Sequence, residues 1–532
     1  MGSRKDTTVS AGSRLEFYAE VGGTANQYQW YKGYSDISGA TDPTLVLDPV
    51  EPDDTGEYSC KITNSLAPDL TLYTRPVYVE IEGFGAEADS LALVALYNAT
   101  HGDEWTNNEN WLSGPVDSWH GISTHNRRVT VIRLYNNNLN GTLPPDIGNL
   151  VNLISLNLSL NQLTGSIPRE IGNLVHLTNL SLYTNDFSGS IPKEFGNLSK
   201  LRSFSCFSNS LEGAIPPEIG NLVNLNSIHL GNNNLSGPIP EEFANLTELS
   251  SIYLYNNDLS GDILNRIIHF VNLSAVSIQG NQFSGRIPKE LCDRETMYML
   301  HLNDNQFSGP IPNEIGNLQN LQFLHLNANE FDGSIPASIG NLSNLKRLSL
   351  SDNNLSGPVP IEFNQLEYVE RMYLHNNQLT DLPDLSGLDS LEYLRVHTNQ
   401  FTFEDIEPNL SIPEFSYIPQ DSIGSRRDTT INEGEALELS VTVGGSANRY
   451  QWYKDDAEID GAQDSVFTIA AVSESDAGKY ICHITSSTVT DLTLYSRPVT
   501  VSVSTESGID EPEQIPLDFA LQPELLQIRS IR

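Results

Sequence analysis

Large apolar residues recur with a fixed period of 24 residues through the middle of the chain. The repeats begin at Val129, Leu153, Leu177, Leu201, Leu225, Leu249, Leu273, Met297, Leu321, Leu345, Val369 and Leu391. Each repeat contains a Leu-x-Leu pair or a close variant, and this alternation predicts a short strand with its apolar residues inward. Twelve such units predict a right-handed solenoid of mixed α/β class with one long, concave parallel sheet.

An asparagine follows the predicted strand in every repeat. These residues are Asn137, Asn161, Asn185, Asn209, Asn233, Asn257, Asn281, Asn305, Asn329, Asn353, Asn377 and Asn399. A buried asparagine can hydrogen-bond backbone groups of a turn that no strand ladder reaches. The Gly and Ile-Pro that follow are expected to turn the chain away from the strand, because proline has no N–H to leave unpaired.

Short alternating runs of apolar and polar residues at both ends of the chain predict two small all-β sandwiches. The two ends match without a gap when they are shifted by 422 residues, so that Trp30 falls on Trp452 and Cys60 on Cys482. The chain therefore carries two copies of one domain, one on either side of the solenoid.

Two motifs in each copy resemble the immunoglobulin fold. Gln-Trp-Tyr-Lys occurs at 29–32 and 451–454, and Asp-x-Gly-x-Tyr-x-Cys ends at Cys60 and Cys482. The resemblance implies structural roles for a buried tryptophan and a tyrosine corner, formed by Trp30, Tyr58, Trp452 and Tyr480. The cysteine expected before each tryptophan is replaced by Phe17 or Leu439. Cys60 and Cys482 are therefore expected to be buried thiols without a disulfide.

The repeat consensus, with its Leu-x-Gly-x-Ile-Pro and Ile-Gly-Asn-Leu phrases, resembles the plant-type leucine-rich repeat. The segment 86–128, with Trp105, Trp111 and Trp119, resembles the N-terminal cap of such solenoids. Plant caps carry cysteines near this position, and their absence favours cysteine-free bacterial relatives. The resemblance implies that ligands bind on the concave face of the sheet.

These patterns divide the chain into consecutive segments. We expect an immunoglobulin-like domain at 1–82, the cap at 86–128, leucine-rich repeats at 129–405, a linker at 406–424, the second immunoglobulin-like domain at 425–503 and an acidic tail at 504–532. The tail segment 515–522 resembles the start of the type IX secretion sorting domain, in degenerate form. No signal peptide is visible, and Met1 aligns with interior sequence, so we expect an N-terminally incomplete protein that is secreted or held at the cell surface.

Outward side chains of the predicted sheet are rich in aromatic rings and imidazoles. The candidate ligand-binding residues are Tyr135, Tyr183, Phe207, His229, Tyr253, Tyr255, His301, Phe323, His325, Tyr373, His375, Arg395 and His397. Such groups offer large contact areas at a low entropy cost, which suits a protein ligand. A polysaccharide is the alternative, and a solvated sheet whose rings only cover one another is a third reading. Two stacked histidines make a poor metal site, so no metal is expected.

The charge and the missing motifs narrow the function further. Asp and Glu outnumber Lys and Arg by 68 to 29, and the resulting net charge of -39 disfavours nucleic acid as a partner. No run of 18 apolar residues predicts membrane insertion. Hydrolase, phosphate-binding and calcium-loop motifs are absent from the sequence, so an enzyme and a cofactor are not expected. We predict a non-catalytic extracellular binding or adhesion protein, with a hydrolase the least favoured reading.

Overall fold

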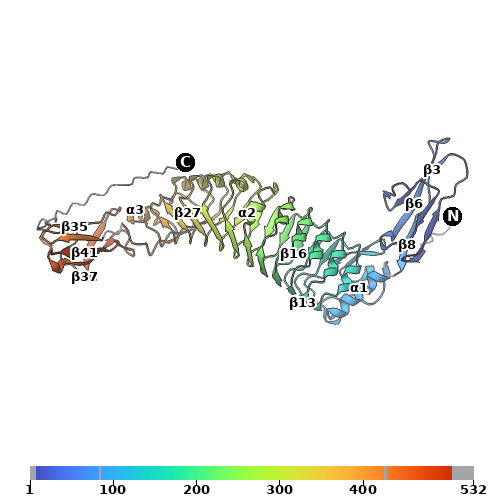
Figure 1. The fold of residues 1–532 in the computed structure, drawn as a ribbon, viewed down its shortest axis with the longest axis horizontal. Coiled ribbons are helices and arrows are strands. Elements are labelled where there is room, and N and C mark those ends of the chain that lie inside the picture. Colours follow the sequence, from blue (N-terminus) through green and yellow to red (C-terminus); the bar gives the residue numbers. More distant parts are fainter. Residues whose placement is uncertain (1–6, 83–85, 425–427, 506–532) are drawn as a thin grey trace, which may run out of the picture. The chain divides into compact units, whose positions relative to one another are not determined.

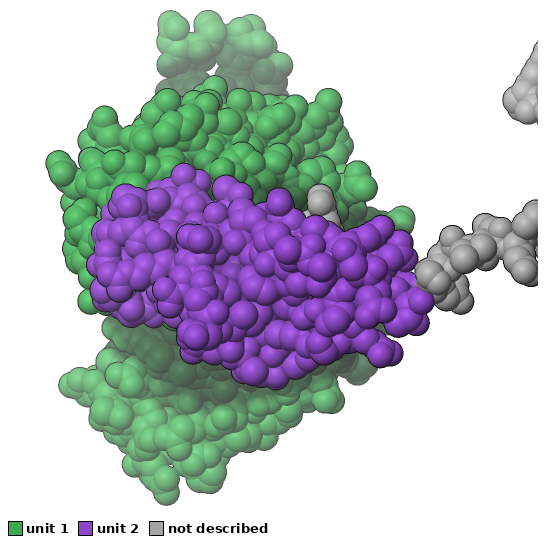
Figure 2. Space-filling view, turned by 90° about the vertical axis from the view of Figure 1, so that its left-hand side faces the viewer, with its two compact units in different colours: residues 1–401, 408–418 green, residues 402–407, 419–532 purple. Residues whose placement is uncertain are grey.

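A computed structural model describes residues 7–82, 86–424 and 428–505 of the chain. The chain divides into two compact units, coloured in Figure 2. Met1–Phe401 and Pro408–Ile418 form the first, and Thr402–Glu407 and Pro419–Arg532 the second. Within the described ranges, no helix has the length and apolar character needed to cross a bilayer. The sorting-domain resemblance at 515–522 lies outside the described residues.

The first immunoglobulin-like sandwich packs a six-stranded sheet against a two-stranded one. The larger sheet has the order β1-β8-β6-β3-β4, with β7 on β6, and the smaller is β2-β5. The strands are β1 (Thr7–Ser10), β2 (Leu15–Tyr18), β3 (Asn26–Lys32), β4 (Ser35–Asp36), β5 (Thr44–Leu47), β6 (Gly56–Asn64), β7 (Thr71–Tyr73) and β8 (Val77–Glu82).

The second sandwich repeats this topology strand for strand. Its strands are β34 (Thr429–Asn432), β35 (Leu437–Ser440), β36 (Asn448–Lys454), β37 (Ala457–Glu458), β38 (Val466–Ile469), β39 (Gly478–Ser486), β40 (Thr493–Tyr495) and β41 (Val499–Ser504).

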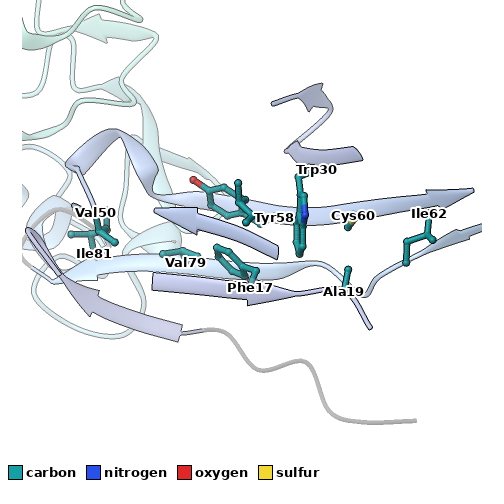
Figure 3. Packing of buried hydrophobic residues seen from close by; sticks show 10 residues of the cluster. Phe17, Ala19, Trp30, Val50, Tyr58, Cys60, Ile62, Val79 and Ile81 are labelled. Atoms are coloured by element: carbon teal, nitrogen blue, oxygen red, sulfur yellow. The ribbon is translucent and has the colours of Figure 1, made fainter. Parts of the chain in front are cut away.

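The core of the first sandwich is built on the predicted tryptophan and tyrosine (Figure 3). Trp30 Nε1 donates to the carbonyl of Asp42 at 3.0 Å, and the Tyr58 hydroxyl donates to the carbonyl of Asp54 at 2.8 Å. Trp452 and Tyr480 make the equivalent bonds in the second copy. All four cysteines of the chain are buried free thiols, which confirms the prediction for Cys60 and Cys482.

The two copies fill the place of the missing disulfide with the same pair of residues in opposite order. Phe17 pairs with Leu45 across β2 and β5, whereas Leu439 pairs with Phe467 across β35 and β38. The Phe17 ring lies 5.0 Å from that of Tyr58, and the Phe467 ring lies 5.8 Å from that of Tyr480. One large and one small side chain thus fill the same volume from either strand.

The solenoid presents a sheet of fourteen strands, one from each end segment and one from every repeat. From β10 to β33 all neighbours are parallel, and β9 pairs antiparallel to β10. The strands are β9 (Ile122–His125), β10 (Arg128–Arg133), β12 (Ser155–Asn157), β14 (Asn179–Ser181), β16 (Ser203–Ser205), β18 (Ser227–His229), β20 (Ser251–Tyr253), β22 (Ala275–Ser277), β24 (Met299–His301), β26 (Phe323–His325), β28 (Arg347–Ser349), β30 (Arg371–Tyr373), β32 (Tyr393–Arg395) and β33 (Glu414–Ser416).

A second parallel sheet, which the sequence did not lead us to expect, forms where the Leu-x-Gly phrase was predicted only to turn the chain. Its eleven strands stack in sequence order (Figure 1). They are β11 (Asn140–Thr142), β13 (Gln162–Ser166), β15 (Asp186–Gly189), β17 (Ser210–Gly213), β19 (Asn234–Pro238), β21 (Asp258–Gly261), β23 (Gln282–Gly285), β25 (Gln306–Pro310), β27 (Glu330–Gly333), β29 (Asn354–Gly357) and β31 (Gln378–Leu379).

The helical part of the first ten repeats is short. It is a single 3-10 turn such as Arg169–Asn173 or Asn313–Asn317, except for the α-helix α2 (Ile263–Arg266) in the sixth repeat. The eleventh repeat, which begins at Val369 and lies wholly within the described residues, has no helical turn. The turns stack closely, because a Cβ on Gly172 would lie 2.5 Å from the carbonyl oxygen of Glu194 in the next repeat. This contact explains the glycine of the Ile-Gly-Asn-Leu phrase.

Both ends of the solenoid are closed by segments that differ from the repeats. Helix α1 (Ala86–Ala99) and three tryptophans form the cap before the first repeat, with Trp111 packed against both Trp105 and Trp119. Part of the segment 406–424, expected to be a linker, instead supplies β33, which pairs with β32. Asn409 is buried there and accepts a hydrogen bond from the Leu385 amide, because the last repeat still has open backbone groups to satisfy.

The asparagines form a column whose side chains bond backbone groups of the turn, as predicted, and also join each repeat to the one before it. Asn161 Nδ2 donates to the carbonyls of Leu134 at 2.8 Å and Leu158 at 2.9 Å. Asn161 Oδ1 accepts from the amides of Asn137 and Leu139. The same pattern of Nδ2 bonds runs to Asn399, and Asn137 extends it into the cap by bonding the backbone of Asn107.

The residue before each of these asparagines has left-handed backbone geometry, with φ between 49° and 65°. Eleven of the twelve are not glycine, and they include Leu160 and Ala328. This conformation costs an L-residue about 1–2 kcal/mol. The bonds from the asparagine side chain hold the turn in place, so the column offsets a strain that recurs in every repeat.

Replacement of Asn233 by alanine should lower the free energy of unfolding by about 3 kcal/mol, because the change leaves buried carbonyl and amide groups unpaired. Asn233 bonds the carbonyls of Cys206 and Leu230 and the amide of Leu211. Urea unfolding followed by circular dichroism measures the change. The neighbouring Asn234 is exposed, so Asn234→Ala is the matched control and should cost less than about 0.5 kcal/mol. Equal losses in both variants would contradict this role of the column.

Replacement of Phe17 by leucine should destabilise the first sandwich by about 1 kcal/mol, because it leaves two small residues facing each other. The double variant Phe17→Leu/Leu45→Phe recreates the arrangement of the second copy and should recover most of the loss. Thermal unfolding of the wild type, both single variants and the double variant gives the coupling free energy, expected at about 1 kcal/mol. A coupling near zero would show that the two positions do not share one volume.

Candidate ligand-binding surface

The thirteen predicted residues all lie at or just beyond the strands from β10 to β32, on the outward face of the fourteen-stranded sheet. We call this surface the sheet face. Tyr135, with 56% of its surface exposed, stands apart from the others. The remaining twelve form three clusters, in which all side chains except the exposed Arg395 are partly buried.

The first cluster is a continuous stack of rings on consecutive strands. The ring centroids of Tyr183 and Phe207 are 4.5 Å apart with planes 8° from parallel, and those of Phe207 and His229 are 4.0 Å apart at 16°. His229 Nε2 lies 3.0 Å from the Tyr255 hydroxyl, and Tyr253 lies 5.0 Å from the imidazole. Gly231 leaves room for the Tyr255 ring, since a Cβ there would lie 2.7 Å from it.

The second cluster centres on two parallel imidazoles. His301 and His325 have centroids 4.1 Å apart and planes that differ by 2°. Phe323 meets His301 edge-on at 6.3 Å, and the Arg347 guanidinium lies 6.0 Å from the Phe323 centroid. His301 Nε2 is buried and has no hydrogen-bond partner among the described residues.

The third cluster combines imidazoles with arginines stacked on tyrosines. His375 and His397 lie 4.5 Å apart, and His375 Nε2 is 3.7 Å from Asp352 Oδ2. Arg395 lies 5.4 Å from the Tyr373 centroid, while Arg371 lies 4.4 Å from that of Tyr393.

Sequence reasoning missed three residues of this surface. Arg347 and Arg371 occupy the same strand position as Phe323. This position lies two residues before that of His325 and Tyr373, and alternate residues of a strand share a face. Tyr298 precedes β24, and its hydroxyl lies 3.5 Å from that of Tyr253. The strand period would have found both arginines, whereas Tyr298 lies outside its strand and gave no signal.

The imidazoles of the sheet face are neutral at pH 7. Burial lowers the pKa of His229 to about 4. Burial, then the nearby His325 and Arg347 charges, lowers the pKa of His301 to about 4, and burial with Arg347 does the same for His325. A neutral imidazole carries one donor and one acceptor nitrogen, so these rings can bond a peptide amide or carbonyl.

The stacked histidines are poorly arranged for metal. The planes of His301 and His325 are parallel and face each other, so their ring nitrogens do not converge on one point. Among the described residues, no group of three or more His, Cys, Asp or Glu side chains is placed to hold a metal ion.

Comparison with known families assigns both sandwiches and most of the repeats to a family. Residues 2–64 and 420–486 match the family described as Immunoglobulin domain. Leucine rich repeat families match 343–401 as one block and 128–150, 152–174, 176–198, 224–246, 297–318 and 320–342 as single repeats. The chain carries leucine-rich repeats flanked by immunoglobulin domains. No enzyme family is indicated.

Among solved structures, the repeats are similar to ectodomains of plant receptor kinases. The ectodomain of GASSHO1/SCHENGEN3 from Arabidopsis thaliana, in complex with CASPARIAN STRIP INTEGRITY FACTOR 2, is 30% identical over 65% of this chain and 45% of its own, with a TM-score of 0.58. The Arabidopsis receptor kinase HAESA, in complex with the peptide hormone IDA and the co-receptor SERK1, is 26% identical over 65% and 62%, with a TM-score of 0.53. This chain thus spans less than two thirds of either relative.

Acidification should destabilise the protein through the buried imidazoles. Their pKa in the folded state lies near 4, below the ordinary value of 6.5. The unfolded chain therefore binds more protons between these values, and stability falls as the pH drops from about 6.5 to about 4. We expect about 1 kcal/mol for each imidazole at about pH 5.5, after allowance for solvent screening.

Thermal unfolding of the variant His301→Gln/His325→Gln across this range measures the effect. The variant should lose less stability than the wild type on acidification. His269 is exposed and lies away from the sheet face, so His269→Gln is the matched control. If the stability of the double variant depended on pH in the same way as that of the wild type, the low pKa values of His301 and His325 would not be the cause of the acid destabilisation.

Proposed function

We propose that the chain is a non-catalytic extracellular binding protein whose sheet face holds an extended segment of a protein ligand. The observation that carries this proposal is the arrangement of its rings and neutral imidazoles in three clusters that follow one another along the sheet, which together we call the row. The two plant ectodomains described above were each solved with a peptide or protein bound, which supports the same use of this solenoid.

The stacking of the rings favours a protein over a polysaccharide. Tyr183, Phe207 and His229 cover one another's faces at 4.0–4.5 Å, and His301 and His325 do the same. A sugar ring binds by stacking on an open aromatic face, whereas a peptide can pack against ring edges and bond to imidazole nitrogens. In these clusters the sheet face presents ring edges and imidazole nitrogens, which suit a peptide.

The size of the row indicates the length of ligand that it can accommodate. The row covers ten strands, from Tyr183 just after β14 to His397 just after β32, and the nine spacings between them at about 4.8 Å each span about 43 Å. An extended peptide rises about 3.3 Å per residue. A segment of about 13 residues therefore reaches from one end to the other.

The location and wider role of the protein follow from this proposal. The immunoglobulin domains space the solenoid from neighbouring modules, and the similar solved structures described above come from plant receptor kinases. We place the protein outside the cell, secreted or on a surface, where it acts in adhesion or recognition. An acidic surface, with a net charge of -39, favours ligands that are neutral or basic.

A binding screen with the full chain tests the proposal. The variant Tyr253→Ala/Tyr255→Ala/His301→Ala/Phe323→Ala removes the centre of the sheet face and should weaken binding of a protein ligand found on an array by at least about 100-fold, since central aromatic contacts dominate such interfaces. Surface plasmon resonance gives the dissociation constants for the wild type and the variant.

The matched control changes four exposed residues at the starts of strands in the second sheet. These are Gln282, Gln306, Glu330 and Gln378, and their replacement by alanine should leave affinity unchanged. Retention of every ligand by the sheet-face variant would refute the proposed surface. Ligands found only among glycans would favour the polysaccharide reading instead.

A further inference from the structure

The two sandwiches differ at one end, although their sequences and topologies match. In the second copy, Val489, Leu492 and Leu494 are buried, and at most 1% of the surface of each residue is exposed. In the first copy, the equivalent Leu70 and Leu72 are 54% and 39% exposed, and the neighbouring Leu66 is 76% exposed. We call this the end face of each sandwich; the paired glycines Gly22-Gly23 and Gly444-Gly445 also belong to it.

The end face of the second sandwich is covered by the segment Thr402–Glu407, which belongs to the same compact unit. This segment contains helix α3 (Phe403–Ile406), whose Phe403 is completely buried. A Cβ on Gly445 would lie 2.6 Å from Phe403 Cβ, and one on Gly444 would clash with the Glu404 carboxylate.

Hydrogen bonds add to this packing in the second sandwich. The Ser446 hydroxyl donates to Glu407 Oε2 at 2.9 Å, and the Ser446 amide points at the same carboxylate. An aromatic side chain, two carboxylates and a short helix therefore fit onto a surface made of two glycines, a hydroxyl residue and buried aliphatic side chains.

The first sandwich keeps the paired glycines and the hydroxyl residue, but among the described residues no segment packs on Gly22. Gly23 has the same left-handed geometry as Gly445, with φ of 111° against 118°, and Thr24 supplies a hydroxyl at the position of Ser446. A Cβ on Gly22 would meet nothing within 4 Å. The face is hollowed instead, with a cavity of about 380 Å³ bordered by Gly23, Leu70 and Leu72.

Exposed leucines around a hollow mark an interaction surface, because apolar area left in water costs about 25 cal/mol per Å². The second copy shows what such a surface accepts. We propose that the end face of the first sandwich docks the end of a second leucine-rich-repeat segment, through a helical turn that carries an aromatic residue followed by carboxylates, as in Phe403–Glu407. Repeats and immunoglobulin domains then alternate in one continuous series.

The full chain, extended at its N-terminus by a further copy of its own residues 86–424, tests this proposal. Residue 424 aligns with residue 2, so the added copy is joined to residue 3 in the natural register. Hydroxyl-radical footprinting reads the exposure of single side chains. Leu70 should be labelled in the parent chain and should lose that labelling in the extended chain, down to the level of the buried Leu492.

Two glycine variants make the result specific to this face. Gly22→Ala meets no neighbour in the parent chain and should leave its melting temperature unchanged, but in the extended chain it should restore the labelling of Leu70. Gly444→Ala in the parent chain should increase the labelling of Leu492.

Labelling of Leu70 that is equal in the parent and extended chains would overturn the proposal. So would protection that survives Gly22→Ala, because it would arise elsewhere. Loss of labelling in the parent chain as its concentration rises would identify a second copy as the occupant, which also contradicts the proposed one.

Discussion

The bonds between asparagine side chains and the backbone of the preceding repeat are the constraint on which the solenoid depends. Each amide group, as at Asn161, joins two repeats and holds a strained left-handed residue between them. Apolar burial alone would allow small shifts between neighbouring repeats, because the hydrophobic effect has no direction. Hydrogen bonds have a fixed geometry and do not allow such shifts, so every repeat takes the same position relative to the one before it. The outward side chains are therefore spaced as regularly as the strands.

This regular spacing makes the chemistry of the sheet face possible. Rings on consecutive strands lie one strand spacing apart, close enough for Tyr183, Phe207 and His229 to stack. Stacking buries part of each imidazole, and burial keeps it uncharged at neutral pH. Uncharged, partly buried imidazoles thus arise on a strongly acidic protein, from residues that would be hydrated and separate on an irregular scaffold.

Periodicity and spacing in the sequence were enough to predict the inward leucines, the asparagine column and the immunoglobulin cores around Trp30 and Trp452. They did not reveal the second sheet, because each of its strands has at most one buried side chain, such as Leu163, and a single residue shows no alternation. The exchange of Phe17 for Phe467 also escaped notice, since only strand pairing places those positions opposite their leucines. Leu492 is buried whereas the equivalent Leu70 is exposed, and no local pattern in the sequence encodes that difference between two copies of one domain.

The asparagine at each repeat bonds only its own repeat and the one before it. Removal or insertion of one whole 24-residue unit therefore leaves every remaining amide with the partners it requires. Unequal recombination between repeats in the gene would yield chains of different length that still fold. Each such event would also change which outward rings become neighbours, so the inheritance of ligand specificity is tied to repeat number as well as to point mutation.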